Sequence, residues 1–384
     1  MEHLGVYSDL VDAARRHLAA GPPGVQATSE PGTAAEPGPA LRQAIRDVLG
    51  FTALPAVPTD VRTERTWSGD GVDGEEVSWS VGYGPRTYAW VLKPSGVEGP
   101  LPAVVALHSH DGVKRYGKEK IADGPDEPAD AVVRLREQSY GGRAFANALA
   151  RMGFLVVAHD VFLWSSRRFP LETMPDRIRR LGALSAAATG DGPDEAYEAA
   201  ARLHEDLVAK YCALLGTTLA GVVAYEDRAA VAYLRSRPDV AGDRVGCVGL
   251  SGGGCRVALL QATSDEVGAA VIVGMMSTHA ALLDRLVDGH TWMFFPSGLA
   301  RVCDWPDLAA SRAPAPLLVQ YDRDDQLFTL EGMQAAHELL VRRYQEAGAP
   351  DAYRGEFYDG PHKFDVAMQE SAFAWLQTHL TPQH

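Results

Sequence analysis

Cysteine is scarce in this sequence. Four cysteines occur among 384 residues, at Cys212, Cys247, Cys255 and Cys303. They form neither a C-x-x-C pair nor a zinc-ligand cluster with histidine, so the common cysteine-based metal sites are excluded. Cys255 and Cys303 are expected to be packing residues. This low and scattered cysteine content predicts a reduced, cytoplasmic protein.

Long apolar runs and an excess of positive charge are also missing. No apolar run approaches the roughly 20 residues that span a membrane. The first ten residues lack the basic start and apolar block of a secretory signal. The formal net charge is -14, with 36 Lys and Arg against 50 Asp and Glu, which disfavours binding to nucleic acid or anionic lipid. We therefore expect no nucleic-acid and no membrane partner.

The sequence does contain enough material for one elaborated α/β domain. Hydrophobic residues make up 46%, an ordinary share for a globular protein. Residues 1–60 are expected to form an N-terminal extension, with helices at 4–20 and 40–49 joined by a proline- and glycine-rich linker. The first helix is expected to pack either on the body or on a second subunit as a homodimer contact. Residues 61–384 are expected to form the catalytic domain.

Strand and helix patterns alternate from residue 61 onward. A hairpin is expected at 76–82 and 86–93, and buried strands at 101–108 and 154–160. Further strands are expected at 245–250, 269–274, 316–321 and 355–358. Helices are expected at 143–152, 193–215, 217–235, 255–262, 330–347 and 364–380. This alternation predicts a mostly parallel, doubly wound sheet with helices on both faces. Residues 161–181 read as irregular, and the block 161–215 is expected to include a helical lid.

The segment around Ser251 predicts a strand, a sharp turn and a helix. An apolar run at 245–250 ends at a serine flanked by Gly249, Gly252 and Gly253, before a helical pattern at 255–262. Such a turn strains the residue at its apex and raises its side chain above the sheet edge. The next N–H lies at a helix start, where an oxyanion would form. Ser251 is therefore the candidate nucleophile, and the Gly252 N–H a candidate oxyanion donor.

Candidates for a base and an acid follow the last two predicted strands. A serine hydroxyl needs a base within hydrogen-bond reach, and on this architecture the acid and then the histidine follow the serine along the chain. His362 comes after the last strand and is the candidate general base. Asp325 is the favoured acid because the Gln-Leu-Phe after it resembles the usual continuation into a helix. Asp322 and Asp324 in the same loop remain alternatives.

The loop after the strand at 101–108 is expected to supply a second oxyanion donor. Backbone N–H groups of residues 108–112 are the candidates, with His110 first. Asp111 adds a carboxylate that would oppose a developing oxyanion, so it is expected to point away or to pair with Lys114. A metal site that joins His108 and His110 to His159 or Asp111 is disfavoured, because no H-x-x-x-H spacing lies on a helix. We expect neither a metal nor a cofactor.

With these residues in place, residues 60–382 resemble the α/β-hydrolase superfamily, and most of all its dienelactone-hydrolase-like and acetyl-xylan-esterase-like branch. The most specific motifs are Leu107-His-Ser-His-Asp-Gly112, Tyr116-Gly-Lys-Glu-Lys120, Tyr140-Gly-Gly-Arg143, Gly249-Leu-Ser-Gly-Gly253 and Gly360-Pro-His-Lys-Phe364. The resemblance implies a serine hydrolase that acts on carboxylic esters without a cofactor. Two departures stand out: dienelactone hydrolases carry a cysteine nucleophile where Ser251 stands, and relatives usually read His-Gly where this chain reads His108-Ser109.

Aromatic residues in the two stretches expected to cover the strand ends are candidates for the substrate pocket, with core packing of a lid as the alternative. These residues are Trp164, Trp292 and Phe295, followed by Phe162, Phe294 and Trp305. Arginines in the first stretch suggest either a contact to an anionic substrate group or, as the favoured interpretation, a solvated helix face. They are Arg167, Arg168, Arg177, Arg179 and Arg180.

The expected function is a carboxylesterase acting on a small-molecule ester, with acyl transfer to Ser251 and hydrolysis by water that His362 activates. A peptidase or amidase, or an acyltransferase or cyclase of secondary metabolism, would use the same triad, and the fold does not decide among them. Epoxide hydrolase or dehalogenase chemistry would need an acidic nucleophile in place of Ser251. A catalytically inactive binding protein is disfavoured because all three triad positions are filled.

Overall fold

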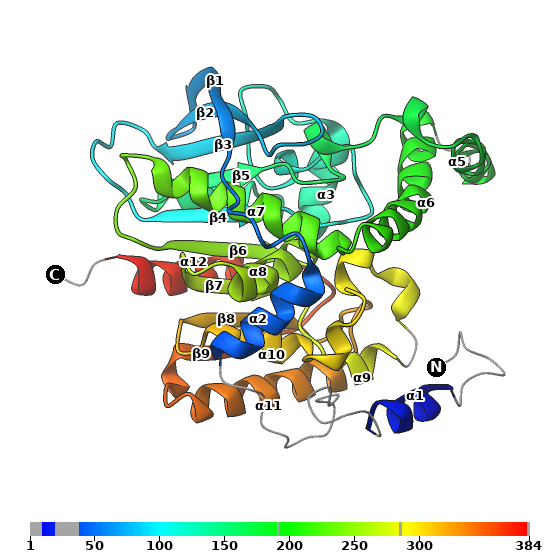
Figure 1. Ribbon diagram of the computed structural model, residues 1–384. Coiled ribbons are helices and arrows are strands. Elements are labelled where there is room, and N and C mark those ends of the chain that lie inside the picture. The colour runs from blue at the N-terminus through cyan, green and yellow to red at the C-terminus, as the bar shows by residue number, and fades with distance from the viewer. Residues whose placement is uncertain (1–9, 20–37, 190–191, 284–285, 382–384) are drawn as a thin grey trace.

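The computed structural model describes residues 10–19, 38–189, 192–283 and 286–381 (Figure 1). Its centre is a nine-stranded sheet with the order β1-β2-β3-β5-β4-β6-β7-β8-β9. The strands are β1 (Thr59–Gly69), β2 (Val72–Ser80), β3 (Thr87–Pro94), β4 (Ala103–Leu107), β5 (Leu155–His159), β6 (Val245–Leu250), β7 (Val267–Val273), β8 (Leu317–Asp322) and β9 (Tyr353–Tyr358). β1, β2, β3 and β5 pair antiparallel in succession, and every pair from β5 to β9 is parallel. The expected mostly parallel sheet is confirmed.

Helices cover both faces of this sheet, because the central strands are apolar on both sides. Along β4, Val104 and Ala106 pack into one core while Val105 and Leu107 pack into the other. One face carries α2 (Gly38–Leu49), α7 (Leu219–Ser236), α8 (Gly252–Thr263), α10 (Trp305–Ala309) and α11 (Leu330–Glu346); the other carries α3 (Asp130–Ser139), α4 (Phe145–Arg151) and α12 (Val366–Leu380). Each large apolar side chain buried this way contributes roughly 1.5–3 kcal/mol. The doubly wound α/β arrangement is as predicted.

The block expected to include a lid is more regular than its sequence suggested. It holds the short turns η3 (Ser165–Arg167) and η4 (Leu171–Thr173) and the helices α5 (Asp176–Thr189) and α6 (Pro193–Leu214). The expectation of irregular chain up to residue 181 is therefore wrong, since α5 begins at Asp176. α5 packs on α6, which also contacts α7, and Figure 1 shows the α5–α6 pair standing out from the body. Its role as a lid stays a prediction.

The N-terminal region divides into two parts of different character. α2 is part of the body, because Leu41, Ile45 and Leu49 are buried in the core beside α8. α1 (Leu10–Ala19) matches most of the predicted first helix, whereas nearly all of the predicted linker lies outside the described residues. The homodimer contact through this helix stays a prediction.

Three further segments complete the fold. The loop expected between 275 and 314 folds into α9 (His279–Leu282), η5 (Val287–Gly289), η6 (Trp292–Phe294), η7 (Leu299–Arg301), α10 and η8 (Ala310–Arg312), and two single turns are η2 (Lys118–Lys120) and η9 (Pro350–Ala352).

Among the described helices none is by itself long and apolar enough to cross a membrane, although α6 and α7 reach that composition as a pair bent by 87°.

Candidate active site

Ser251 lies at the sharp turn between β6 and α8, as its glycine neighbours predicted. Its backbone has φ 56° and ψ -117°, a conformation that costs free energy in a residue with a side chain. The turn is held because the Ser251 N–H donates to the Val273 carbonyl over 2.8 Å. A Cβ atom at Gly253 would lie 2.2 Å from the Leu107 carbonyl oxygen, so only glycine permits α8 to approach β4 this closely. The strained turn leaves the serine at the start of a helix.

His362 and Asp325 meet directly. The Nδ1 atom of His362 lies 2.6 Å from Oδ2 of Asp325, and the aspartate side chain is 1% exposed. Oδ1 of Asp325 accepts the Leu327 N–H over 2.8 Å, which fixes the carboxylate. The imidazole also lies against the chain just after β7, since a Cβ at Gly274 would be 3.1 Å from its Cε1. The loops after β7, β8 and β9 therefore hold this pair at one edge of the sheet.

The other two aspartates of the loop have different partners. Asp324 is exposed, and its carboxylate accepts the Gly360 N–H over 2.9 Å, which ties the two loops together. Asp322 is buried, with Oδ2 accepting the Lys363 N–H over 3.0 Å and Oδ1 left without a partner among the described residues. The structure thus places Asp325, rather than either alternative, in hydrogen-bond contact with His362.

Burial and charge shift the pKa values of this group. Burial alone would lower the pKa of His362, but the hydrogen bond and charge of Asp325, with the charges of Asp322 and Asp111, raise it above 6.5. Burial raises the pKa of Asp322 to about 7. Asp322, Asp325 and His362 also offer ligand atoms within 4.8 Å of one another, the one described cluster able to hold a metal ion. Within this cluster the Nδ1 atom of His362 already bonds Asp325.

Two backbone segments come together beside the serine. A Cβ atom at Gly252 would lie 2.8 Å from the backbone nitrogen of His110, so the loop after β4 abuts the start of α8. The first N–H groups of a helix have no acceptor within it. The His110 N–H donates to no acceptor in the part of the chain that the structure describes. Both predicted oxyanion donors thus lie next to each other and next to Ser251.

The charges around this loop pair differently from the prediction. Lys114 pairs with Glu205 of α6, and Asp111 lies 3.4 Å from Nζ of Lys120. The predicted Asp111–Lys114 pair is therefore wrong. Asp111 is a residue of the cavity wall beside Ser251, and its carboxylate bonds Ser109 Oγ and faces the buried Lys120.

Ser251 and His362 line one small cavity of about 250 Å³. Its wall consists of His110, Asp111, Gly112, Ser251, Gly252, Met275, Gly289, His290, Thr291, Phe294, Leu327, Phe328 and His362. His290 stacks on Phe294 and packs against Phe328 at a tilt, with ring centroids 5.1 and 4.8 Å away. Burial lowers the pKa of His290 to about 4, so the ring is neutral near pH 7. The sequence did not single out His290, because no strand end or motif precedes it.

Most of the predicted pocket aromatics lie outside this wall. Trp164 is 1% exposed and packs behind His110, with ring centroids 5.3 Å apart. Trp292 is 45% exposed and donates from Nε1 to Asp206 over 2.7 Å. Phe295 packs on the edge of Phe294, and Trp305 is buried beneath Phe294. Of the six, only Phe294 lines this cavity, whereas Trp164 and Phe295 pack against lining residues. The substrate contact of Trp164, Trp292 and Phe295 stays a prediction.

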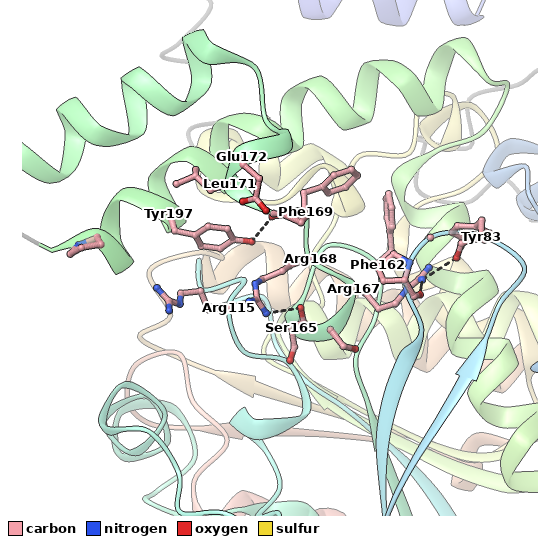
Figure 2. Close-up of a pocket in the computed structure, with 15 residues that line it drawn as sticks. Tyr83, Arg115, Phe162, Ser165, Arg167, Arg168, Phe169, Leu171, Glu172 and Tyr197 are labelled. Atoms are coloured by element: carbon pink, nitrogen blue, oxygen red, sulfur yellow. Dashed lines mark hydrogen bonds between the residues drawn. The ribbon is translucent and has the colours of Figure 1, made fainter. Parts of the chain in front are cut away.

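A second, larger cavity of about 960 Å³ lies elsewhere and contains neither Ser251 nor His362 (Figure 2). Phe162, Arg167 and Arg168 contribute to its wall. Arg167 is buried in an ion pair with Glu226, so its predicted solvated position is wrong. Arg168 is exposed and donates to the Ser165 carbonyl over 3.0 Å, as Figure 2 shows.

The remaining three arginines of that stretch follow the favoured interpretation. Arg177, Arg179 and Arg180 are exposed on α5, and Arg179 pairs with Asp176 one turn away. A solvated helix face is thus confirmed for these three. None of them lines the cavity that holds Ser251.

Comparisons with known proteins agree on the fold. No family model matches the chain. The chain is 26% identical over 293 residues to the "Putative hydrolase YtaP" of Bacillus subtilis (strain 168), which covers 76% of this chain and 83% of that protein. It is structurally similar to a glucuronoyl esterase from Solibacter usitatus, with a TM-score of 0.62 and 14% identity over 92% of this chain and 100% of that one. It is also similar to acetyl xylan esterase 1 from Thermoanaerobacterium sp. JW/SL YS485, with a TM-score of 0.56 and 15% identity over 91% and 96%. The chain has the α/β-hydrolase fold.

Proposed function

We propose that this protein is a serine hydrolase of the carboxylesterase type. Ser251 is the nucleophile, His362 the general base, and Asp325 the acid that orients the imidazole. The observation that carries the proposal is the hydrogen bond from His362 to Asp325, made by an imidazole that lines the same cavity as a strained serine. The esterase and hydrolase names of the similar proteins support the same chemistry.

The reaction follows from these positions. His362 takes the proton from the Ser251 hydroxyl as its oxygen attacks the ester carbonyl carbon, and the N–H groups of Gly252 and His110 donate to the oxyanion that forms. Asp325 stabilises the imidazolium. The ester C–O bond then breaks, and His362 returns the proton to the departing alcohol. Water attacks the acyl group with His362 again as base, which releases the carboxylic acid and restores Ser251.

The size of the cavity predicts a preference for short acyl groups. At about 250 Å³ the cavity is smaller than the roughly 300–1,000 Å³ of most small-molecule sites, and Phe294 and Phe328 close one side of it. We expect kcat/KM to fall steadily from p-nitrophenyl acetate through the butyrate to the octanoate. Steady-state kinetics on the three esters, with the matching p-nitroanilides beside them, make this measurement. Turnover of the anilides without turnover of the esters would replace the esterase by an amidase.

The raised pKa of His362 sets the pH dependence. The base must be neutral to accept a proton, so kcat/KM should rise with pH and reach half its plateau above pH 6.5, the ordinary value for histidine. Because the Asp322 carboxyl contributes to that shift, Asp322→Asn should move the half-point to lower pH while it leaves the plateau within about threefold. A pH–rate profile of both proteins on p-nitrophenyl acetate tests this. Identical half-points would show that the Asp322 charge does not reach the base.

A further inference from the structure

Buried cations hold the carbonyl groups of the loop that follows β4. Nζ of Lys120 donates to the carbonyls of Ser109 and His110 over 3.0 and 2.9 Å. Nη1 of Arg256 donates to the preceding carbonyl, that of His108, over 3.2 Å. Three consecutive carbonyls are thus each bonded to a charged donor, and hydrogen bonds to charged groups are the stronger kind.

Lys120 is itself built into the protein interior. Its side chain is 0% exposed, and it ends the turn η2. Arg136 of α3 holds that turn, since its guanidinium donates to the carbonyls of Glu119, Lys120 and Ala122 over 2.6 to 3.2 Å. A lysine is seldom buried completely unless it is paired, because desolvation of an ammonium group is costly. The cost is offset here by the two carbonyls and by the Asp111 carboxylate 3.4 Å away.

The geometry of the peptide bond turns this contact into a constraint on the site. In a planar trans peptide the C=O and the following N–H point in opposite directions. The one cis bond within the described ranges is Ala313–Pro314, so the bond between Ser109 and His110 is trans. With its carbonyl bonded to Lys120, this peptide directs the His110 N–H away from the ammonium. The His110 nitrogen lies beside Gly252, where an added Cβ would be 2.8 Å from it.

We propose that Lys120 is a positioning residue of the oxyanion hole, which rests on the proposed esterase function. Its ammonium group fixes the Ser109–His110 peptide so that the His110 N–H faces the reacting carbonyl. The same ammonium balances the carboxylate of Asp111, a residue of the cavity wall, whose charge would otherwise oppose a developing oxyanion. Tyr140 adds a second brace, because its hydroxyl donates to Ser109 Oγ over 2.7 Å, and that oxygen bonds Asp111.

The test is Lys120→Met, which keeps the length of the side chain and removes the ammonium. Loss of one oxyanion donor lowers kcat by about 100- to 1,000-fold, so misdirection of the His110 N–H should lower kcat for p-nitrophenyl acetate by about 100-fold. KM should change by less than about threefold, since the hole acts on the transition state. The affinity for a boronic acid inhibitor, whose hydroxyl occupies the hole, should fall in parallel with kcat/KM.

Lys118→Met is the matched control. Lys118 lies in the same turn, is 4% exposed and pairs with Asp160 over 3.0 Å, but it contacts no carbonyl of the loop. Lys118→Met should lower the thermal stability by about as much as Lys120→Met does, and it should keep the wild-type kcat. Unchanged kcat in Lys120→Met, or equal kcat losses in the two variants, would overturn the proposal.

Wild-type turnover is measured first, because its absence would remove the esterase function itself, whereas normal turnover with an unaffected Lys120→Met removes only the positioning role. If Lys120→Met does not fold, Tyr140→Phe removes a single hydroxyl from the second brace of the same loop. It should lower kcat about tenfold at constant KM, and wild-type kcat in that variant would contradict the proposal.

Discussion

Ser251→Ala is expected to lower kcat for p-nitrophenyl acetate by about a million-fold, which leaves only the residual rate that binding and the oxyanion hole supply. The variant loses the one atom that bonds to the acyl group, while the turn and cavity that surround it remain. KM for the residual reaction should stay near the wild-type value. Steady-state kinetics at high enzyme concentration, with inhibitor-treated wild type to measure contamination, give the ratio.

Ser277→Ala is the matched control for that substitution. Ser277 likewise follows a central strand, it is buried, and its hydroxyl has no hydrogen-bond partner among the described residues. Its removal should leave kcat unchanged. Wild-type hydrolysis by Ser251→Ala would mean that another group attacks the ester, and the proposed mechanism would be lost.

Asp325→Asn is expected to lower kcat by about 10,000-fold, the cost of leaving a triad histidine in the wrong tautomer. An asparagine can present an N–H to Nδ1 of His362, which reverses the polarity of a 2.6 Å hydrogen bond. It also removes the largest charge contribution to the raised pKa of His362, so the remaining activity should reach half its plateau at lower pH than in the wild type.

Asp324→Asn isolates the effect of position within the same loop. Among the described residues the Asp324 side chain bonds only the Gly360 N–H, and an asparagine carbonyl can accept that N–H equally well. Its kcat should stay within about threefold of the wild type. If Asp324→Asn lowers kcat as much as Asp325→Asn or more, the assignment of Asp325 as the acid is wrong.

Local sequence patterns were sufficient where the chemistry of the turn or strand is itself local. The glycines around Ser251 predicted a sharp turn because only glycine allows α8 to lie against β4, and apolar runs predicted the parallel strands from β4 to β8. Asp325 was favoured over its two neighbours from three residues that follow it, and the structure places Asp325 against His362.

Elements without an apolar periodicity were missed for a physical reason. β1 lies at the edge of the sheet and its residues are exposed on both faces, apart from a half-buried Trp67, so no alternation marks it as a strand. α3 and α5 were missed as well. α5 is rich in alanine and arginine and exposes most of its surface, so no apolar stripe marks it as a helix.

The walls of the site depend on contacts between distant parts of the chain, which no local pattern encodes. Glu205 of α6 bonds Lys114, which lies 91 residues earlier, and also accepts from Thr291 and Trp292. These contacts join the loop after β4 to the loop that carries His290. Because Lys114 bonds Glu205, it does not pair with Asp111. In the same part of the site, Phe294 rather than its aromatic neighbours lines the cavity.

The most direct test of the account is covalent labelling with a fluorophosphonate followed by peptide mapping. We expect a single phosphonylated peptide, with the label on Ser251, and loss of labelling in His362→Ala because the hydroxyl then has no base. Labelling that falls on another residue, or that proceeds at the wild-type rate without the imidazole, would contradict the convergence of these side chains on one reaction.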